Sequence, residues 1–209
     1  MSKPSLGIIG SGRLGTAIAR QASAAGYVVR LANSRGPESL SLIVKVLLPG
    51  VIAATVDEAI LQSDSIVLAL PLNQYKSLPV QLLKGKIVID AMNYWPPTEG
   101  EIPEFMSQEV SSSEYIEQHL PGARIVKTLN HMAYNELEQH SLPEASPGRR
   151  AIALVGNDAD AKAKVEVLIN DMGFDAVDLG MLSNGRRLQP DTPLFNTRLT
   201  AQEIRSSQG

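Results

Sequence analysis

The chain has 209 residues, of which 44% are hydrophobic and 20% are charged, as in an ordinary globular domain. It has no cysteine, which excludes disulfides, thiolate nucleophiles and iron–sulfur clusters. A formal net charge of −3, with no basic stripe, argues against nucleic acid as a partner.

Metal-binding and membrane classes are also disfavoured. The three histidines do not have metal-ligand spacing, so we expect no metal site. The most apolar stretch, 40–54, is interrupted by Lys45, Pro49 and Gly50 and is too broken to span a bilayer. The first four residues lead directly into a strand and do not resemble a signal peptide. We therefore expect a cytoplasmic protein with no membrane partner.

Short apolar runs alternate with helical patterns along most of the chain. Strands are predicted over 6–9, 27–32, 51–55, 66–70, 86–89, 124–129, 151–155 and 174–179. Helices are predicted over 13–25, 37–48, from 57 onward, 113–119, 133–139, 158–172 and 200–205. The second of these helices is predicted to bury an apolar face made of Leu40, Ile43, Val44, Leu47 and Leu48.

This alternation predicts an α/β fold of the Rossmann type, with a doubly wound, mostly parallel sheet and a small C-terminal extension. One domain over 1–209 is the simplest division. The polar loop 142–148 is the weakest seam, and it leaves open a minor C-terminal lobe over 149–209.

A glycine-rich motif follows the first predicted strand and opens the first predicted helix. The pattern is G-x-G-x-x-G, formed by Gly10, Ser11, Gly12, Arg13, Leu14 and Gly15. The first glycine permits a tight turn, the second lets the backbone approach a pyrophosphate, and the third lets the helix pack on the sheet. The free N–H groups of the helix N-terminus favour the anion. The motif predicts a dinucleotide site.

The end of the second predicted strand indicates which dinucleotide is preferred. NAD-binding proteins place an acid there for the ribose 2′-hydroxyl, whereas this chain has Asn33, Ser34 and Arg35. A hydroxyl and a guanidinium suit a 2′-phosphate, to which Ser11 can add a second hydroxyl. We therefore predict NADP(H) as the cofactor.

The carboxyl ends of later strands are predicted to border the same ligand, because open α/β sheets bind ligands at that edge. Leu70 and Pro71 follow the fourth strand, and Asn93 follows the fifth. These residues are predicted to flank the ribose and the nicotinamide, although Asn93 is about as well explained as the cap of its own loop.

Taken together, these segments and the tail resemble the coenzyme-F420-dependent NADP oxidoreductases. The ferrireductase domain of the STEAP membrane proteins looks related. The resemblance extends over 7–15, 33–40, 67–71, 87–93, 126–133 and 173–195. It implies hydride transfer between NADP(H) and the deazaflavin ring of coenzyme F420, and a homodimer.

The resemblance also implies an acceptor-binding group made of His131, Met132, Ala133 and Leu182. Two features differ from relatives: no further basic residue follows Arg35, and Ala133 stands where some relatives have proline. Trp95 adds bulk near the expected pocket. The ring acceptor therefore stays open between F420 and a flavin.

No catalytic side chain is predicted, because hydride transfer between stacked rings requires orientation rather than a protein nucleophile. His131 is the one acid–base candidate. Trp95 is a candidate for stacking on a flat acceptor, although an aromatic that covers the core is at least as good an explanation. Two alternatives remain: an NADP(H)-binding redox sensor without turnover, and a ferric or cupric reductase that relies on a flavin.

Overall fold

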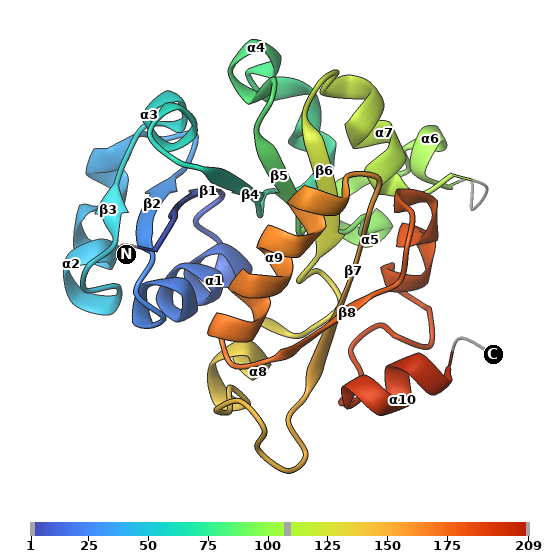
Figure 1. Cartoon of the computed structure of the whole chain (residues 1–209). Coiled ribbons are helices and arrows are strands. Elements are labelled where there is room, and N and C mark those ends of the chain that lie inside the picture. Colours follow the sequence, from blue (N-terminus) through green and yellow to red (C-terminus); the bar gives the residue numbers. More distant parts are fainter. Residues whose placement is uncertain (1–2, 107–109, 208–209) are drawn as a thin grey trace.

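A computed structural model describes residues 3–106 and 110–207, and these form one eight-stranded sheet with helices on both faces (Figure 1). The strand order is β3-β2-β1-β4-β5-β6-β7-β8. The strands are β1 (Ser5–Ile9), β2 (Val28–Ala32), β3 (Ile52–Ala53), β4 (Ser65–Leu68), β5 (Ile87–Asp90), β6 (Arg124–Thr128), β7 (Ala151–Gly156) and β8 (Asp175–Asp178). The predicted Rossmann-type fold is confirmed.

The first six strands are parallel, so they all end at one edge of the sheet, which we call the carboxyl edge. β7 pairs with β6 in the antiparallel direction, with Val126 opposite Gly156, and β8 runs parallel to β7. β7 and β8 therefore continue the same sheet but run in the direction opposite to the first six strands. The chain adds strands outward from β1 to β3 on one side and then from β4 to β6 on the other, so the strand order reverses between β1 and β4. Doubly wound sheets bind their ligands at such a switch point.

Two helical layers cover the sheet. The α-helices are α1 (Arg13–Ala24), α2 (Ser41–Leu47), α3 (Val56–Leu61), α4 (Val80–Leu83), α5 (Pro96–Glu99), α6 (Pro103–Met106), α7 (Ser112–His119), α8 (Tyr134–Gln139), α9 (Ala159–Asp171) and α10 (Ala201–Ser206). The 3₁₀ helices are η1 (Pro37–Leu40), η2 (Leu72–Ser77) and η3 (Leu182–Leu188).

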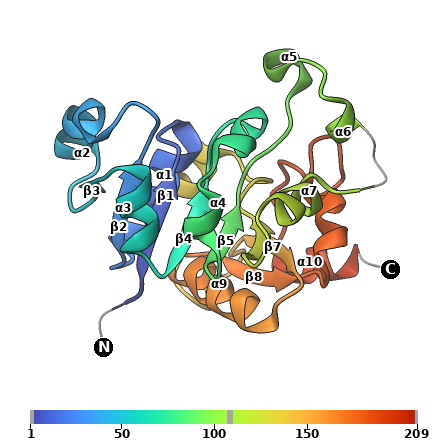
Figure 2. The same cartoon turned by 90° about the horizontal axis from the view of Figure 1, so that it is seen from above.

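Each face of the sheet has its own hydrophobic core. One core includes buried side chains from α1, α8 and α9, such as Ile18, Leu137 and Ile169. The other includes side chains from α3, α7 and η3, such as Ile60 and Leu182. Figure 2 shows α2 and α3 beside one end of the sheet, and α7 and α10 beside the other.

Helix starts follow local capping rules. Thr55 and Glu58 form a reciprocal capping box at α3, in which the Thr55 hydroxyl accepts from Glu58 N–H and the Glu58 carboxylate accepts from Thr55 N–H. Asp158 caps α9 by accepting from the N–H of Ala161. The predicted helices from 57 and over 158–172 are therefore present with nearly the predicted bounds.

Two predicted elements differ from the structure. The third strand is limited to Ile52–Ala53 at the sheet edge, and the helix over 37–48 is divided into η1 and α2. The predicted burial of Leu47 is wrong, because 55% of its surface is exposed and α2 has no buried residue. Beside a two-residue edge strand there is too little sheet for α2 to cover.

Several short helices were not predicted. η2 follows Pro71, α5 contains Pro96, and η3 occupies part of the tail expected to be loop. Each is four to seven residues long, too short to show a periodic apolar pattern. Within residues 3–106 and 110–207, no helix has the length and apolarity that a membrane span requires.

Candidate functional site

The turn between β1 and α1 has room for glycine only. Gly10 has a φ of +117°, and a Cβ at this position would lie 2.2 Å from the backbone oxygen of Ala69. A Cβ on Gly15 would lie 1.9 Å from the backbone oxygen of Gly10. A Cβ on Gly12, by contrast, would meet nothing within 4 Å. The turn is therefore packed tightly against β4, while its middle residue faces open space.

The first turn of α1 suits an anion. Its N-cap, Gly12, makes no side-chain capping bond, and the first turn contains no acidic residue. The N–H groups of this turn have no partner within the helix, and the helix dipole is positive at this end. These features, together with the open space at Gly12, fit a dinucleotide pyrophosphate.

The loops after β1 and β2 are joined by the side chain of Asn33. Its Nδ2 donates to the hydroxyls of Ser11 (3.1 Å) and Ser39 (3.0 Å), and its Oδ1 accepts from the N–H of Arg35 (2.9 Å). Ser34 and Arg35 are exposed. Asn33 therefore organises the surface on which Ser11, Ser34 and Arg35 were predicted to bind a phosphate.

These loops line one cleft of about 300 Å³ at the carboxyl edge, together with the segment after β4. Eight predicted cofactor residues contribute to it: Gly10, Ser11, Gly12, Asn33, Ser34, Arg35, Leu70 and Pro71. The cleft also contains Val56, Gln74, Ser77, Leu78 and Pro79, which sequence reasoning missed. Gln74 and Ser77 belong to η2, and the only sequence signal for that side of the cleft is Pro71.

Arg13 does not line this cleft but points toward α8. Its guanidinium donates to the Tyr134 hydroxyl (3.1 Å) and lies 5.5 Å from the centre of the Tyr134 ring. Tyr134 is the first residue of α8 and directly follows Ala133. Arg13 therefore contacts the residue that directly follows the predicted acceptor residue Ala133. The other two motif residues outside the cleft support the turn, Leu14 by packing against the core and Gly15 as described above.

Asn93 contacts the neighbouring loop and does not cap its own. Its Nδ2 donates to the backbone oxygen of Asn130 (2.7 Å), and its Oδ1 accepts from the Asn130 side chain (2.9 Å). The Asn130 amide also donates to the backbone oxygen of Leu188 (2.6 Å). This Asn93–Asn130 clasp joins the loops after β5 and β6 to the end of η3.

The predicted acceptor group is not gathered on one surface. His131, Met132 and Leu182 are buried, and Ala133 is half-buried. Met132 and Leu182 belong to the separate cores on opposite faces of the sheet. Their contact with an acceptor stays a prediction.

The environment of His131 does not suit an acid–base residue. Its Nε2 accepts a hydrogen bond from the N–H of Ala153 (3.1 Å), which places the proton of the neutral ring on Nδ1. Burial, aided by the charges of Lys127 and Arg150, lowers the pKa of His131 to about 3. The ring is therefore neutral and buried at physiological pH.

An exposed tryptophan and a half-buried phenylalanine border the carboxyl edge. Trp95 follows the loop of Asn93, has 45% of its surface exposed, and makes an edge contact with Phe195 at 5.8 Å between ring centres. The next tail residue, Asn196, donates its N–H to the backbone oxygen of His131 (2.7 Å). Trp95 and Phe195 therefore lie beside the loop that follows β6.

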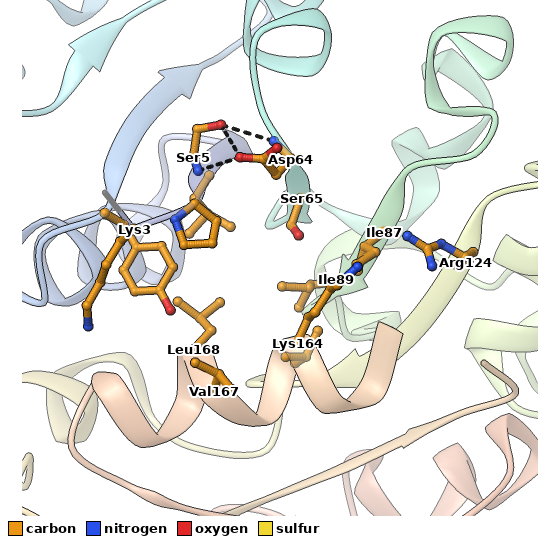
Figure 3. A pocket seen from close by; sticks show the side chains of 14 residues that line it. Lys3, Ser5, Asp64, Ser65, Ile87, Ile89, Arg124, Lys164, Val167 and Leu168 are labelled. Carbon is orange, nitrogen blue, oxygen red and sulfur yellow. Dashed lines mark hydrogen bonds between the residues drawn. The ribbon is translucent and has the colours of Figure 1, made fainter. Parts of the chain in front are cut away.

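A larger hollow of about 560 Å³ lies at the opposite edge of the sheet, between the starts of β1, β4 and β5 and helix α9 (Figure 3). Its floor is apolar, and three cations on its rim are paired: Lys3 with Asp171, and Arg124 and Lys164 with Asp160. This hollow is far from the glycine turn and offers no helix N-terminus, so it does not fit the dinucleotide.

A metal site is not evident either. Among residues 3–106 and 110–207, no three histidine, aspartate or glutamate side chains cluster closely enough to hold a metal ion.

Similarity to known proteins agrees with this geometry. Residues 5–94 match the family of NADP oxidoreductases described as coenzyme F420-dependent. A solved structure of the hypothetical protein SMa0349 from Sinorhizobium meliloti is 32% identical, with a TM-score of 0.82 over 95% of this chain and 96% of that one. A protein from Arthrobacter sp. FB24, described as a candidate F420-dependent NADP reductase, has a TM-score of 0.75 at 24% identity, covering 95% of this chain and all of that one.

Curated relatives include metalloreductases. The chain is 28% identical over 191 residues to metalloreductase STEAP3 of Rattus norvegicus and 30% identical over 190 residues to metalloreductase STEAP2 of Homo sapiens. The matches cover 89% and 90% of this chain but only 36% and 35% of those proteins, so the chain spans about a third of their length. The glycine turn and the cleft lie within residues 5–94, the part of the chain that is similar to the coenzyme-F420-dependent NADP oxidoreductases.

Proposed function

We propose that the protein binds NADPH in the carboxyl-edge cleft and transfers its hydride to a flat ring acceptor, coenzyme F420 or a flavin. One observation carries the proposal. The cleft that contains the glycine turn also contains Ser11, Ser34 and Arg35, and it has no carboxylate among its lining residues. A carboxylate would repel a 2′-phosphate, whereas a guanidinium pairs with it.

Each part of the cleft has a defined task in this proposal. The backbone at Gly12 and the first turn of α1 hold the pyrophosphate, while Ser34 and Arg35 hold the 2′-phosphate. Leu70 and Pro71, at the end of β4, border the ribose of the nicotinamide half. The bound cofactor supplies the hydride chemistry, and the protein supplies orientation and exclusion of water.

Trp95 is the residue we assign to the acceptor. It is exposed, and it lies next to a loop that the Asn93–Asn130 clasp holds in place. An aromatic face of this kind binds a flat ring by offset stacking. Replacing Trp95 with alanine should raise the KM for the ring acceptor and leave the NADPH affinity unchanged.

The decisive experiment is calorimetric titration with NADPH and NADH, followed by mixing the NADPH complex with F420, FMN or FAD. We expect tighter binding of NADPH than of NADH, and loss of NADPH absorbance with at least one ring acceptor. Binding without oxidation by any of them would favour the redox sensor. Absence of binding by either dinucleotide would overturn the proposal.

A second candidate, a ferric or cupric reductase, is favoured by the similarity to the metalloreductases. In that case the chain passes electrons from NADPH to a flavin, and the flavin reduces the metal. Reduction of ferric citrate that requires both NADPH and added flavin would support it. We also propose a homodimer, and sedimentation analysis would test it.

A further inference from the structure

A buried ion pair lies between the ends of β5 and β6. The ammonium of Lys127 is 3.3 Å from Oδ2 of Asp90, and both side chains are fully buried. Removing two charges from water costs several kcal/mol each, and apolar residues of similar size often give equal or greater stability. Stability alone therefore does not account for this pair.

The pair binds both polar groups of one backbone residue. Oδ1 of Asp90 accepts from the N–H of Met92 (3.0 Å), and the Lys127 ammonium donates to the carbonyl of Met92. The Ser113 hydroxyl, from the start of α7, donates to Oδ2 of Asp90 (2.6 Å). The backbone at Met92 is thus held from its own strand and from the neighbouring one.

The next residue along the chain is Asn93, whose side chain forms the clasp with Asn130 described above. Leu129, just before Asn130, has a φ of +65°, which is unusual for a branched residue and costs energy. Two layers of side-chain contacts therefore hold the loops after β5 and β6 in one conformation at the carboxyl edge.

We propose that Lys127 and Asp90 are positioning residues that set the backbone of residues 92–93 as the wall for the nicotinamide half of the dinucleotide. This inference rests on the proposed function. The adenosine half lies over β1 and β2, and the nicotinamide half lies over β4 and β5, because ligands follow the carboxyl ends across the switch point. The pair is therefore expected to act on one half of the ligand only.

Comparing two ligands distinguishes effects on the two halves of the dinucleotide. NADPH has both halves, whereas adenosine 2′,5′-bisphosphate has only the adenosine half. The double variant Lys127→Met with Asp90→Asn removes both charges of this pair together and retains a side-chain oxygen for the Met92 N–H. We expect it to weaken NADPH binding roughly tenfold, because small displacements at a reacting ring are costly. Its affinity for the bisphosphate should change by less than about twofold.

The matched control is Lys86→Met. Lys86 precedes β5 at the opposite end, and its ammonium also donates to a backbone oxygen, that of Ser63 (2.7 Å). This variant should bind both ligands like the wild type. If the double variant unfolds, Ser113→Ala, which removes one contact to Asp90, should give a smaller loss for NADPH alone.

Three results decide the inference. A loss confined to NADPH, in variants with wild-type circular dichroism, supports it. Equal losses for both ligands, or no loss for either, would overturn it and assign the pair a purely structural role. Failure of the wild-type protein to bind NADPH would instead overturn the proposed function.

Discussion

The carboxyl edge consists of two regions built in different ways. Over β1, β2 and β4, the edge is made of backbone, small residues and exposed polar side chains, with Gly12 and Arg35 facing the cleft. Over β5 and β6, it is made of buried polar side chains, including Asp90, Lys127 and Asn130. The first region depends on glycines, whose missing side chains leave room in the turn. The second region depends on side-chain contacts between residues far apart in the sequence. A phosphate site can be local, whereas a wall for a reactive ring needs rigidity from several elements.

The largest effect should come from filling the turn in the first region. Gly15→Ala places a Cβ 1.9 Å from the Gly10 oxygen, so the free energy of unfolding should fall by about 4 kcal/mol or more. Gly12→Ala should leave stability within about 0.5 kcal/mol, because that Cβ meets open space, yet it should weaken NADPH binding. Urea unfolding and calorimetry measure the two effects. A Gly12→Ala variant with normal affinity would contradict our placement of the pyrophosphate.

In the second region, the buried His131 should make the free energy of unfolding depend on pH. Because burial lowers the pKa of His131 to about 3, the unfolded chain binds a proton near pH 6 that the folded chain does not. Stability contributed by the neutral ring is therefore lost as the pH falls from about 6.5 toward 3.

His131→Gln should remove this loss, since the glutamine amide does not titrate. Between pH 6 and 4, the wild type should lose about 2 to 3 kcal/mol more unfolding free energy than the variant. Urea titrations at several pH values measure it, with His140→Gln, at a half-buried histidine, as the control. Parallel curves for wild type and His131→Gln would show that His131 is not buried in its neutral form.

Returning to the first region, Arg35→Glu should separate the two dinucleotides. A charge-assisted hydrogen bond contributes about 2 kcal/mol, so NADPH affinity should fall roughly thirtyfold or more. NADH affinity should change little, because NADH has no 2′-phosphate. Arg35→Ala should give a smaller loss in the same direction. Equal losses for NADPH and NADH would show that the 2′-phosphate is not bound there.

The smallest effect should come from the contact that joins the regions. Tyr134→Phe removes the hydrogen bond from Arg13 but keeps the ring beneath the guanidinium. This exposed bond contributes less than about 1 kcal/mol, so NADPH affinity should fall by roughly threefold at most. Tyr134→Ala removes both contacts and should cost more. If the wild type and both variants bound NADPH with the same affinity, α8 would have no role in the cofactor site.

Sequence reasoning succeeded where structure is local. The parallel strands, the glycine turn and the capped helices follow from patterns within about a dozen residues, and the cleft residues Ser11 and Arg35 were predicted from the same rules. Gln74 and Ser77 were missed because a 3₁₀ helix of six residues is too short to show a periodic apolar pattern.

The second region could not be predicted for a different reason. Nothing in the sequence around Asp90 or Lys127 shows that the two side chains lie beside each other in the interior. The contact of Asn130 with Leu188 joins residues 58 positions apart. Pairings of this kind depend on strand order and register, which a hydrophobic pattern does not specify.

The reversed direction of β7 has a consequence for the order of assembly. After β8 ends at the far edge, η3 crosses back over β6 and β7, and residues 188–196 return to the carboxyl edge beside Asn130 and His131. The strands β1, β2 and β4, over which we propose that the phosphates bind, pair with one another through β1 and lie early in the chain. The wall over β5 and β6 lacks its final contacts until much later in translation. In the proposed binding mode, the residues for the adenosine half are therefore complete early in the chain, whereas the wall for the nicotinamide half depends on residues near its C-terminal end.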